Sequence, residues 1–137
     1  MAFRKRLGQW ENWILALLAV LILGLLIGAF FDYYYDLNDD VLMKDILAGV
    51  YTGVPEGHNI QMLWPVSAFI SLLYRLAGRL PWYGLFLCGC HFGCILLLIQ
   101  RAVSLCGKLS GKLAVALTAG CFFGSFFLEH LIYAQYT

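Results

Sequence analysis

Charged residues are scarce in this sequence. They make up 12% of its 137 residues, whereas hydrophobic residues make up 62%. A soluble domain is usually about half apolar and about a quarter charged, so this composition excludes an ordinary soluble protein. The net charge is +1, and no basic arm or basic patch interleaved with aromatic residues is present. The sequence therefore does not predict binding to nucleic acid.

Catalytic and metal-binding patterns are also missing. There is no Ser-His-Asp arrangement, no nucleophile elbow and no phosphate-loop spacing. The string CGCHFGC holds Cys88, Cys90 and Cys94, but Cys88 does not share a helix face with the other two, and no second Cys/His pair offers zinc spacing. We expect no metal and no cofactor. In an apolar helix these cysteines act as small hydrophobic residues, and Gly89 and Gly93 form a small-residue packing seam.

Long uncharged runs are what the sequence does contain. Residues 13–31, 81–99 and 113–130 are each long enough, or nearly so, to cross a hydrocarbon core of about 30 Å as a helix. A fourth apolar stretch, in the segment 62–77, is short for a span. The sequence predicts an all-α, polytopic integral membrane protein forming a single membrane domain (residues 1–137). It has three transmembrane helices plus outer amphipathic and juxtamembrane helices, with four transmembrane helices as the alternative.

Basic residues set the expected orientation, because positively charged loops stay in the cytoplasm. Arg4, Lys5 and Arg6 place the N-terminus inside. With three spans, six basic residues lie inside and three outside; with four spans the numbers are five and four. The charge bias therefore favours three spans in a bacterial-type inner membrane, with the acidic segment 32–61 outside.

The outer segment, residues 32–80, is expected to hold two helices lying at the membrane surface. Apolar residues recur at helical spacing over about 41–51, and Asp39 and Asp40 precede them at positions that can cap a helix. Glycines and a proline then break the chain before the second helix, at about 62–77.

This order of parts resembles the N-terminal module of the GT-C glycosyltransferases, in particular the protein O-mannosyltransferase and aminoarabinose transferase branch. The resemblance is carried by the acidic pair Asp39-Asp40 after the first span, followed by VLMKDILAGVYTG. The His-led segment HNIQMLWPVSAFISLLYRLAG and the basic loop QRAVSLCGKLSGK between two spans add to it, and Glu129 stands just beyond the last span. The paired prolines usual after the leading His are absent here, with Asn59 and Ile60 in their place. The chain has only the front of that architecture, as a truncated relative would.

The resemblance implies roles for five residues. Asp39 and Asp40 are the candidate catalytic residues, one acting as a general base while a lipid phosphate leaves the sugar. His58, Glu129 and His130 are candidates for substrate binding. The competing interpretation is a solvated, helix-capping acidic loop that also enforces topology. We expect the acidic pair and Glu129 to face one outer cavity.

Two functions follow from this sequence. The first is the front module of a glycosyltransferase that uses a polyprenyl-phosphate-linked sugar, inactive by itself. The alternative is a small non-enzymatic membrane protein that packs against another membrane protein, for which Gly24 and Gly28 offer a second small-residue seam. Both place the chain in a lipid bilayer.

Overall fold

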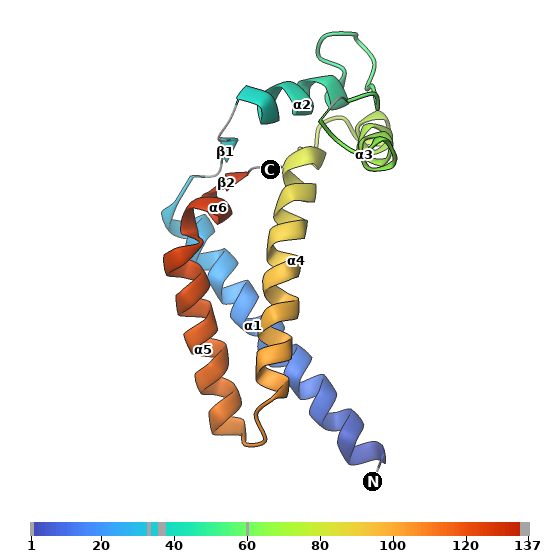
Figure 1. Ribbon diagram of the computed structural model, residues 1–137. Coiled ribbons are helices and arrows are strands. Elements are labelled where there is room, and N and C mark those ends of the chain that lie inside the picture. Colours follow the sequence, from blue (N-terminus) through green and yellow to red (C-terminus); the bar gives the residue numbers. More distant parts are fainter. Residues whose placement is uncertain (1, 33, 36–37, 60, 135–137) are drawn as a thin grey trace. The chain divides into compact units, whose positions relative to one another are not determined.

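Three long helices dominate the fold. The protein is described by a computed structural model, which covers residues 2–32, 34–35, 38–59 and 61–134. The helices α1 (Ala2–Phe30), α4 (Trp82–Ser104) and α5 (Leu109–Phe126) are long and apolar enough to cross a membrane (Figure 1). Helices satisfy their own backbone hydrogen bonds, as a lipid environment requires. The predicted helical fold, with three helices long and apolar enough to span a membrane, is confirmed.

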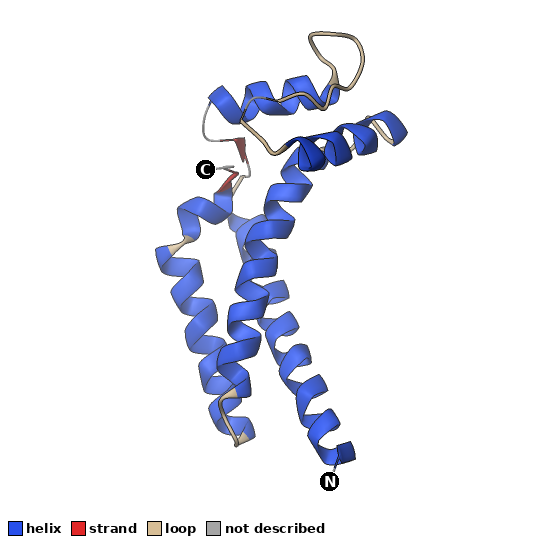
Figure 2. Ribbon diagram, turned by 45° about the vertical axis from the view of Figure 1, so that its right-hand side comes forward, coloured by secondary structure: helices blue, strands red, loops and turns tan. Residues whose placement is uncertain are grey.

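The remaining elements are short. They are the helices α2 (Asn38–Ala48), α3 (Trp64–Leu76) and α6 (Leu128–Ile132) and the strands β1 (Tyr34–Tyr35) and β2 (Tyr133–Ala134). With 13 residues, α3 is well short of the roughly 20 needed for a span. The two strands pair in parallel, Tyr34 with Tyr133 and Tyr35 with Ala134 (Figure 2). The hydropathy pattern did not predict this minimal pairing, which lies outside the three candidate spans.

The chain forms two compact units. The first unit comprises Met1–Tyr33 and Cys90–Ile132, and the second comprises Tyr34–Gly89 and Tyr133–Thr137. The division falls inside α4, so the beginning of that helix belongs to the second unit and the rest to the first.

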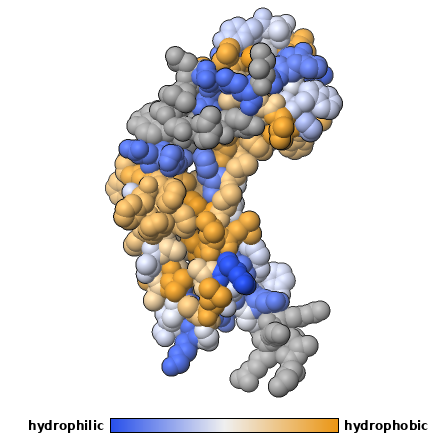
Figure 3. Space-filling view, viewed as in Figure 1, coloured by the Kyte–Doolittle hydropathy of each residue, from blue (hydrophilic) through white to orange (hydrophobic). Residues whose placement is uncertain are grey.

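In the first unit, α1 packs along α5. Gly124 allows a close approach, since a Cβ there would lie 3.2 Å from Leu23 Cδ1. The two helices are also joined by an ion pair, in which Lys112 Nζ lies 3.2 Å from Glu11 Oε1. Most large apolar side chains of these helices remain exposed, and hydrophobic colours cover much of them in Figure 3. Such a surface is stable in lipid and not in water.

Of the four glycines in the two predicted packing seams, only Gly24 lies against a neighbouring helix among the residues the structure describes. A Cβ at Gly24 would lie 3.7 Å from the ring of Phe92, so this glycine lies against α4. Added Cβ atoms at Gly28, Gly89 and Gly93 would meet nothing within 4 Å among the residues the structure describes. The seam expected at Gly89 and Gly93 therefore has no helix against it in this part of the chain.

The second unit has its own core. Its members come from α2, α3, the start of α4 and one loop residue: Met43, Leu47, Met62, Ile70, Tyr74, Tyr83 and Leu87. The C-terminus of α2 ends in a Schellman motif. Gly49 adopts φ +78°, its N–H donates to Ile46 O, and the N–H of Val50 donates to Asp45 O. This motif turns the chain back toward α3.

The helix α2 begins earlier than the sequence pattern suggested. It starts at Asn38, so Asp39 and Asp40 lie inside its first turn and not ahead of it. Carboxylates in a first turn are stabilised by the positive end of the helix dipole. The buried face of α2 runs through Asp40, Met43 and Leu47.

Candidate functional site

The two aspartates of the acidic pair have different environments. Asp40 is 2% exposed, and the hydroxyl of fully buried Tyr83 donates a 2.7 Å hydrogen bond to its Oδ1. The backbone N–H of Tyr83 in turn donates to the hydroxyl of Tyr74, at 3.1 Å. Asp40 thus joins the first turn of α2 to the start of α4 and, through Tyr74, to α3.

Asp39 lies on the same turn but is exposed. Its Oδ2 accepts a long hydrogen bond, 3.4 Å, from Nε2 of Gln61. A buried carboxylate held by a tyrosine is suited to fixing a helix, whereas an exposed one can reach a ligand. Of the two candidates, only Asp39 has the accessibility that acid–base chemistry requires.

His58, whose side chain is 81% exposed, lies at the rim of a pocket of the second unit. Most of the lining is apolar, but the pocket also has the ionisable side chains of Glu56, His58 and Arg75, and we call it the polar pocket. The pocket has a volume of about 320 Å³ and lies between the loop segment 56–58 and one face of α3. The α3 residues that line it are Trp64, Ala68, Ser71, Leu72 and Arg75. Trp64, Ala68, Ser71 and Arg75 recur at intervals of three or four residues, which places them on one helix face.

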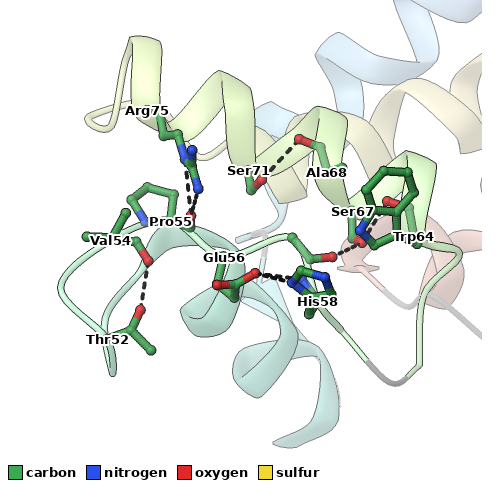
Figure 4. Close-up of polar contacts among 11 residues, drawn as sticks. Thr52, Val54, Pro55, Glu56, His58, Trp64, Ser67, Ala68, Ser71 and Arg75 are labelled. Carbon is green, nitrogen blue, oxygen red and sulfur yellow. Dashed lines mark hydrogen bonds and ion pairs between the residues drawn. The ribbon is translucent and has the colours of Figure 1, made fainter.

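Hydrogen bonds from α3 hold the loop side of this pocket in place (Figure 4). The guanidinium of Arg75 donates to the carbonyl of Pro55, from Nη2 at 2.8 Å and from Nε at 3.2 Å. The hydroxyl of Ser67 donates to the carbonyl of Gly57. Gly57 is required by this close approach, since a Cβ would lie 2.9 Å from Cα of Ala68.

The side chains of Glu56 and His58 contact each other across a tight turn, where they face each other in Figure 4. His58 Nδ1 lies 2.5 Å from Glu56 Oε1, and the backbone N–H of His58 donates to the same oxygen at 3.1 Å. The side-chain hydrogen bond from His58 lowers the pKa of Glu56 below its ordinary value, and the backbone hydrogen bond adds to this. Glu56 is therefore a carboxylate at neutral pH.

Glu129 and His130 lie on α6, just after α5, and both are exposed. The ring of His130 lies 6.3 Å from that of Phe127, centroid to centroid. These two residues belong to the first unit and the acidic pair to the second. That Asp39 and Glu129 face one cavity stays a prediction.

The cysteines of the CGCHFGC string are unpaired. Cys90 and Cys94 are exposed, and Cys88 is partly buried. Among the residues that the structure describes, no three His, Cys, Asp or Glu side chains are grouped so as to hold a metal ion.

Comparison with protein-family models, with curated proteins and with solved structures finds no match for this chain.

Several residues of this region escaped the sequence analysis. Trp64 and Arg75 were not among the candidate site residues predicted from the sequence. Their spacing with Ala68 and Leu72 along one helix face was the available signal. No local signal connects Asp40 with Tyr83, because 43 residues separate them.

Proposed function

We propose that this chain is a membrane protein that acts as the front module of a glycosyltransferase using lipid-phosphate-linked sugars. The observation that supports the proposal is the difference between the environments of the two aspartates in the acidic pair. Asp40 fixes the start of α2 through Tyr83, and Asp39 stands exposed on that fixed turn. A general base has to be both accessible and held in position.

In this proposal, Asp39 accepts a proton or a hydrogen bond from a hydroxyl of the acceptor or of the sugar. Asp39 lines neither the polar pocket nor the groove between α1 and α5, so neither of these two pockets encloses it together with a substrate. We therefore expect the chain alone to bind a lipid-linked sugar without transferring it. The N-terminus is cytoplasmic in this proposal, the acidic segment lies outside, and the membrane is a bacterial-type inner membrane.

Binding is the direct test. The purified chain is placed in nanodiscs, and binding of a polyprenyl-phosphate-linked sugar is measured by native mass spectrometry. Asp39→Asn should weaken binding roughly tenfold, the value of one hydrogen bond to a charged group. Asp45→Asn removes a carboxylate elsewhere on α2 and should leave binding unchanged. The absence of saturable binding, or equal binding by Asp39→Asn, would refute the proposal, and detectable sugar transfer would refute inactivity of the chain alone.

The alternative, a non-enzymatic protein packed against a membrane partner, is favoured by a different observation. An apolar groove of about 520 Å³ lies between α1 and α5. Its α5 wall includes the small residues Ala116, Gly120 and Gly124, and a Cβ at Gly120 would meet nothing within 4 Å. Small residues let a further helix approach closely in a bilayer.

This alternative predicts that Gly120→Leu, which fills the groove, abolishes association measured by cross-linking in native membranes. Leu113→Ile is the control, because it changes an exposed residue of the same helix that does not line the groove, without changing its volume. Loss of cross-linking in Gly120→Leu, together with normal sugar binding, would support partner packing as a separate property. Equal cross-linking in both variants would remove it.

A further inference from the structure

Helix α3 exposes large apolar side chains in addition to those that it buries, since Ile70 and Tyr74 already lie in the core of the second unit. Its buried positions include Ser67 and Ser71, whose hydroxyls donate to backbone carbonyls. Its exposed positions include the large apolar side chains of Trp64, Phe69, Leu72 and Leu76, and Leu63 just before the helix is also exposed. The mean exposure of such residues in a helix surrounded by water is low, because burial of each contributes about 1.5–3 kcal/mol. An exposed apolar face of this kind is typical of a helix in contact with acyl chains.

The polar pocket lies along this apolar face. Trp64 and Leu72 belong to both, being 60% and 50% exposed while also lining the pocket. A molecule that occupied the pocket could therefore place a polar group inside it and apolar chains along α3. Membrane lipids combine a polar headgroup with apolar acyl chains and therefore match this arrangement.

The charges in the pocket are of opposite sign. Arg75 supplies a guanidinium that, beyond its two bonds to Pro55, carries further N–H donors. Glu56 supplies a carboxylate whose side chain is 43% exposed. Both contacts with His58 use its Oε1, so its Oε2 is the oxygen that a ligand would meet. A purely anionic headgroup would be repelled by Glu56, and a purely cationic one by Arg75. A headgroup with one charge of each sign satisfies both.

We propose that this pocket binds the headgroup of an amine-bearing zwitterionic phospholipid of the phosphatidylethanolamine type. Arg75 binds the phosphate. The primary ammonium lies between the carboxylate of Glu56 and the indole face of Trp64, which attracts cations. A primary ammonium donates N–H hydrogen bonds to a carboxylate, whereas a trimethylammonium has none to donate. The predicted order of preference is thus phosphatidylethanolamine, then phosphatidylcholine, then phosphatidylglycerol. This inference does not depend on the proposed function.

The test is lipid competition in native mass spectrometry of the full chain, released from micelles that contain the three phospholipids in equal amounts. The wild type should retain phosphatidylethanolamine over phosphatidylglycerol by roughly fivefold, as expected for one partly exposed ion pair with a cation–π contact. Glu56→Gln and Trp64→Leu should each lower this preference toward equality. Arg75→Gln should weaken retention of all three lipids, because they share the phosphate.

Matched controls separate the pocket from net charge. Arg79→Gln removes the same charge from an exposed residue just beyond α3, and Asp32→Asn removes an exposed carboxylate of the first unit. Both should retain the wild-type preference. Arg75→Lys keeps the positive charge and should retain the wild-type lipid preference. If Arg75→Gln has the circular dichroism of Arg75→Lys but retains less lipid, its loss of lipid binding reflects the lost charge and not unfolding.

Water-soluble glycerophosphoethanolamine distinguishes a lipid site from a site for the free headgroup. It should not displace the lipid at millimolar concentration, because it lacks the acyl chains that contact α3. Equal retention of phosphatidylglycerol and phosphatidylethanolamine by the wild type would overturn the proposal. So would an unchanged preference in Glu56→Gln, or full displacement by the soluble headgroup.

Discussion

Removing the hydroxyl of Tyr83 perturbs the contact that holds the acidic turn of α2. Tyr83→Phe keeps the aromatic ring in the core and deletes the hydroxyl, which donates the 2.7 Å bond to Asp40 Oδ1 and also lies 4.0 Å from Met43 Sδ. Water cannot easily replace this donor, because Tyr83 is 0% and Asp40 2% exposed. A hydrogen bond to a charged group contributes about 1.5–3 kcal/mol, so the free energy of local opening of α2 should fall by about that amount.

Hydrogen exchange of the α2 amides in bicelles measures this free energy directly. The matched control is Tyr51→Phe, which removes a hydroxyl that is 3.4 Å from Asp45 Oδ2 on a residue 63% exposed. This control should change the opening free energy by less than about 0.5 kcal/mol. In a double-mutant cycle, Tyr83→Phe and Asp40→Asn should couple by about 1 kcal/mol or more. If Tyr83→Phe costs no more than Tyr51→Phe, the bond from Tyr83 to Asp40 does not hold α2 in place, and that basis for distinguishing the two aspartates is lost.

Three further predictions concern other parts of the chain. Gly49→Ala should destabilise the second unit by about 2 kcal/mol or more, because a Cβ there would lie 2.3 Å from the backbone carbonyl carbon of Val54. The control is Gly53→Ala, at φ +73° but with nothing within 4 Å of the added Cβ, which should cost only about 1 kcal/mol. Thermal unfolding of the two variants compares these costs. Glu11→Gln should destabilise the packing of α1 on α5 by roughly 1–3 kcal/mol, because it leaves the buried ammonium of Lys112 without its carboxylate partner. Unfolding in detergent measures this loss. The control variant Lys108→Gln, which changes an exposed lysine, should show no such loss. The pKa of Glu56, followed by carbon NMR, should be lower in the wild type than in a His58→Ala variant. Because the folded-state pKa is lowered, the contact with His58 stabilises the turn above the ordinary glutamate pKa, and this contribution is lost as the pH falls through the lowered value. Equal titration of Glu56 in both proteins would contradict this assignment.

Hydropathy and length were sufficient to predict the three spanning helices, because a chain in lipid has few alternatives to a helix. The presence of α2 and α3 also followed from local signals, namely apolar residues at helical spacing and glycines that end the helices. The start of α2 was placed too late, because a first-turn aspartate and a capping aspartate have the same appearance in sequence.

Long-range contacts could not be obtained from the sequence. The bond between Tyr83 and Asp40, the pair of Lys112 with Glu11 and the pairing of β1 with β2 each join residues far apart in the chain. Local periodicity carries no information about such partners. The polar pocket was missed for the same reason, since its loop and helix walls become neighbours only when Arg75 and Ser67 bind the loop carbonyls.

The membrane topology of the chain decides whether the acidic turn, the polar pocket and Glu129 can act on the same side. Single cysteines at positions 79, 108 and 129, in a background lacking the five native cysteines, are labelled in intact and in permeabilised cells with a membrane-impermeant reagent. The three-span account predicts that positions 79 and 129 are labelled in intact cells and that position 108 is labelled only after permeabilisation. Labelling of position 108 in intact cells, with position 79 protected, would establish four spans and contradict the account.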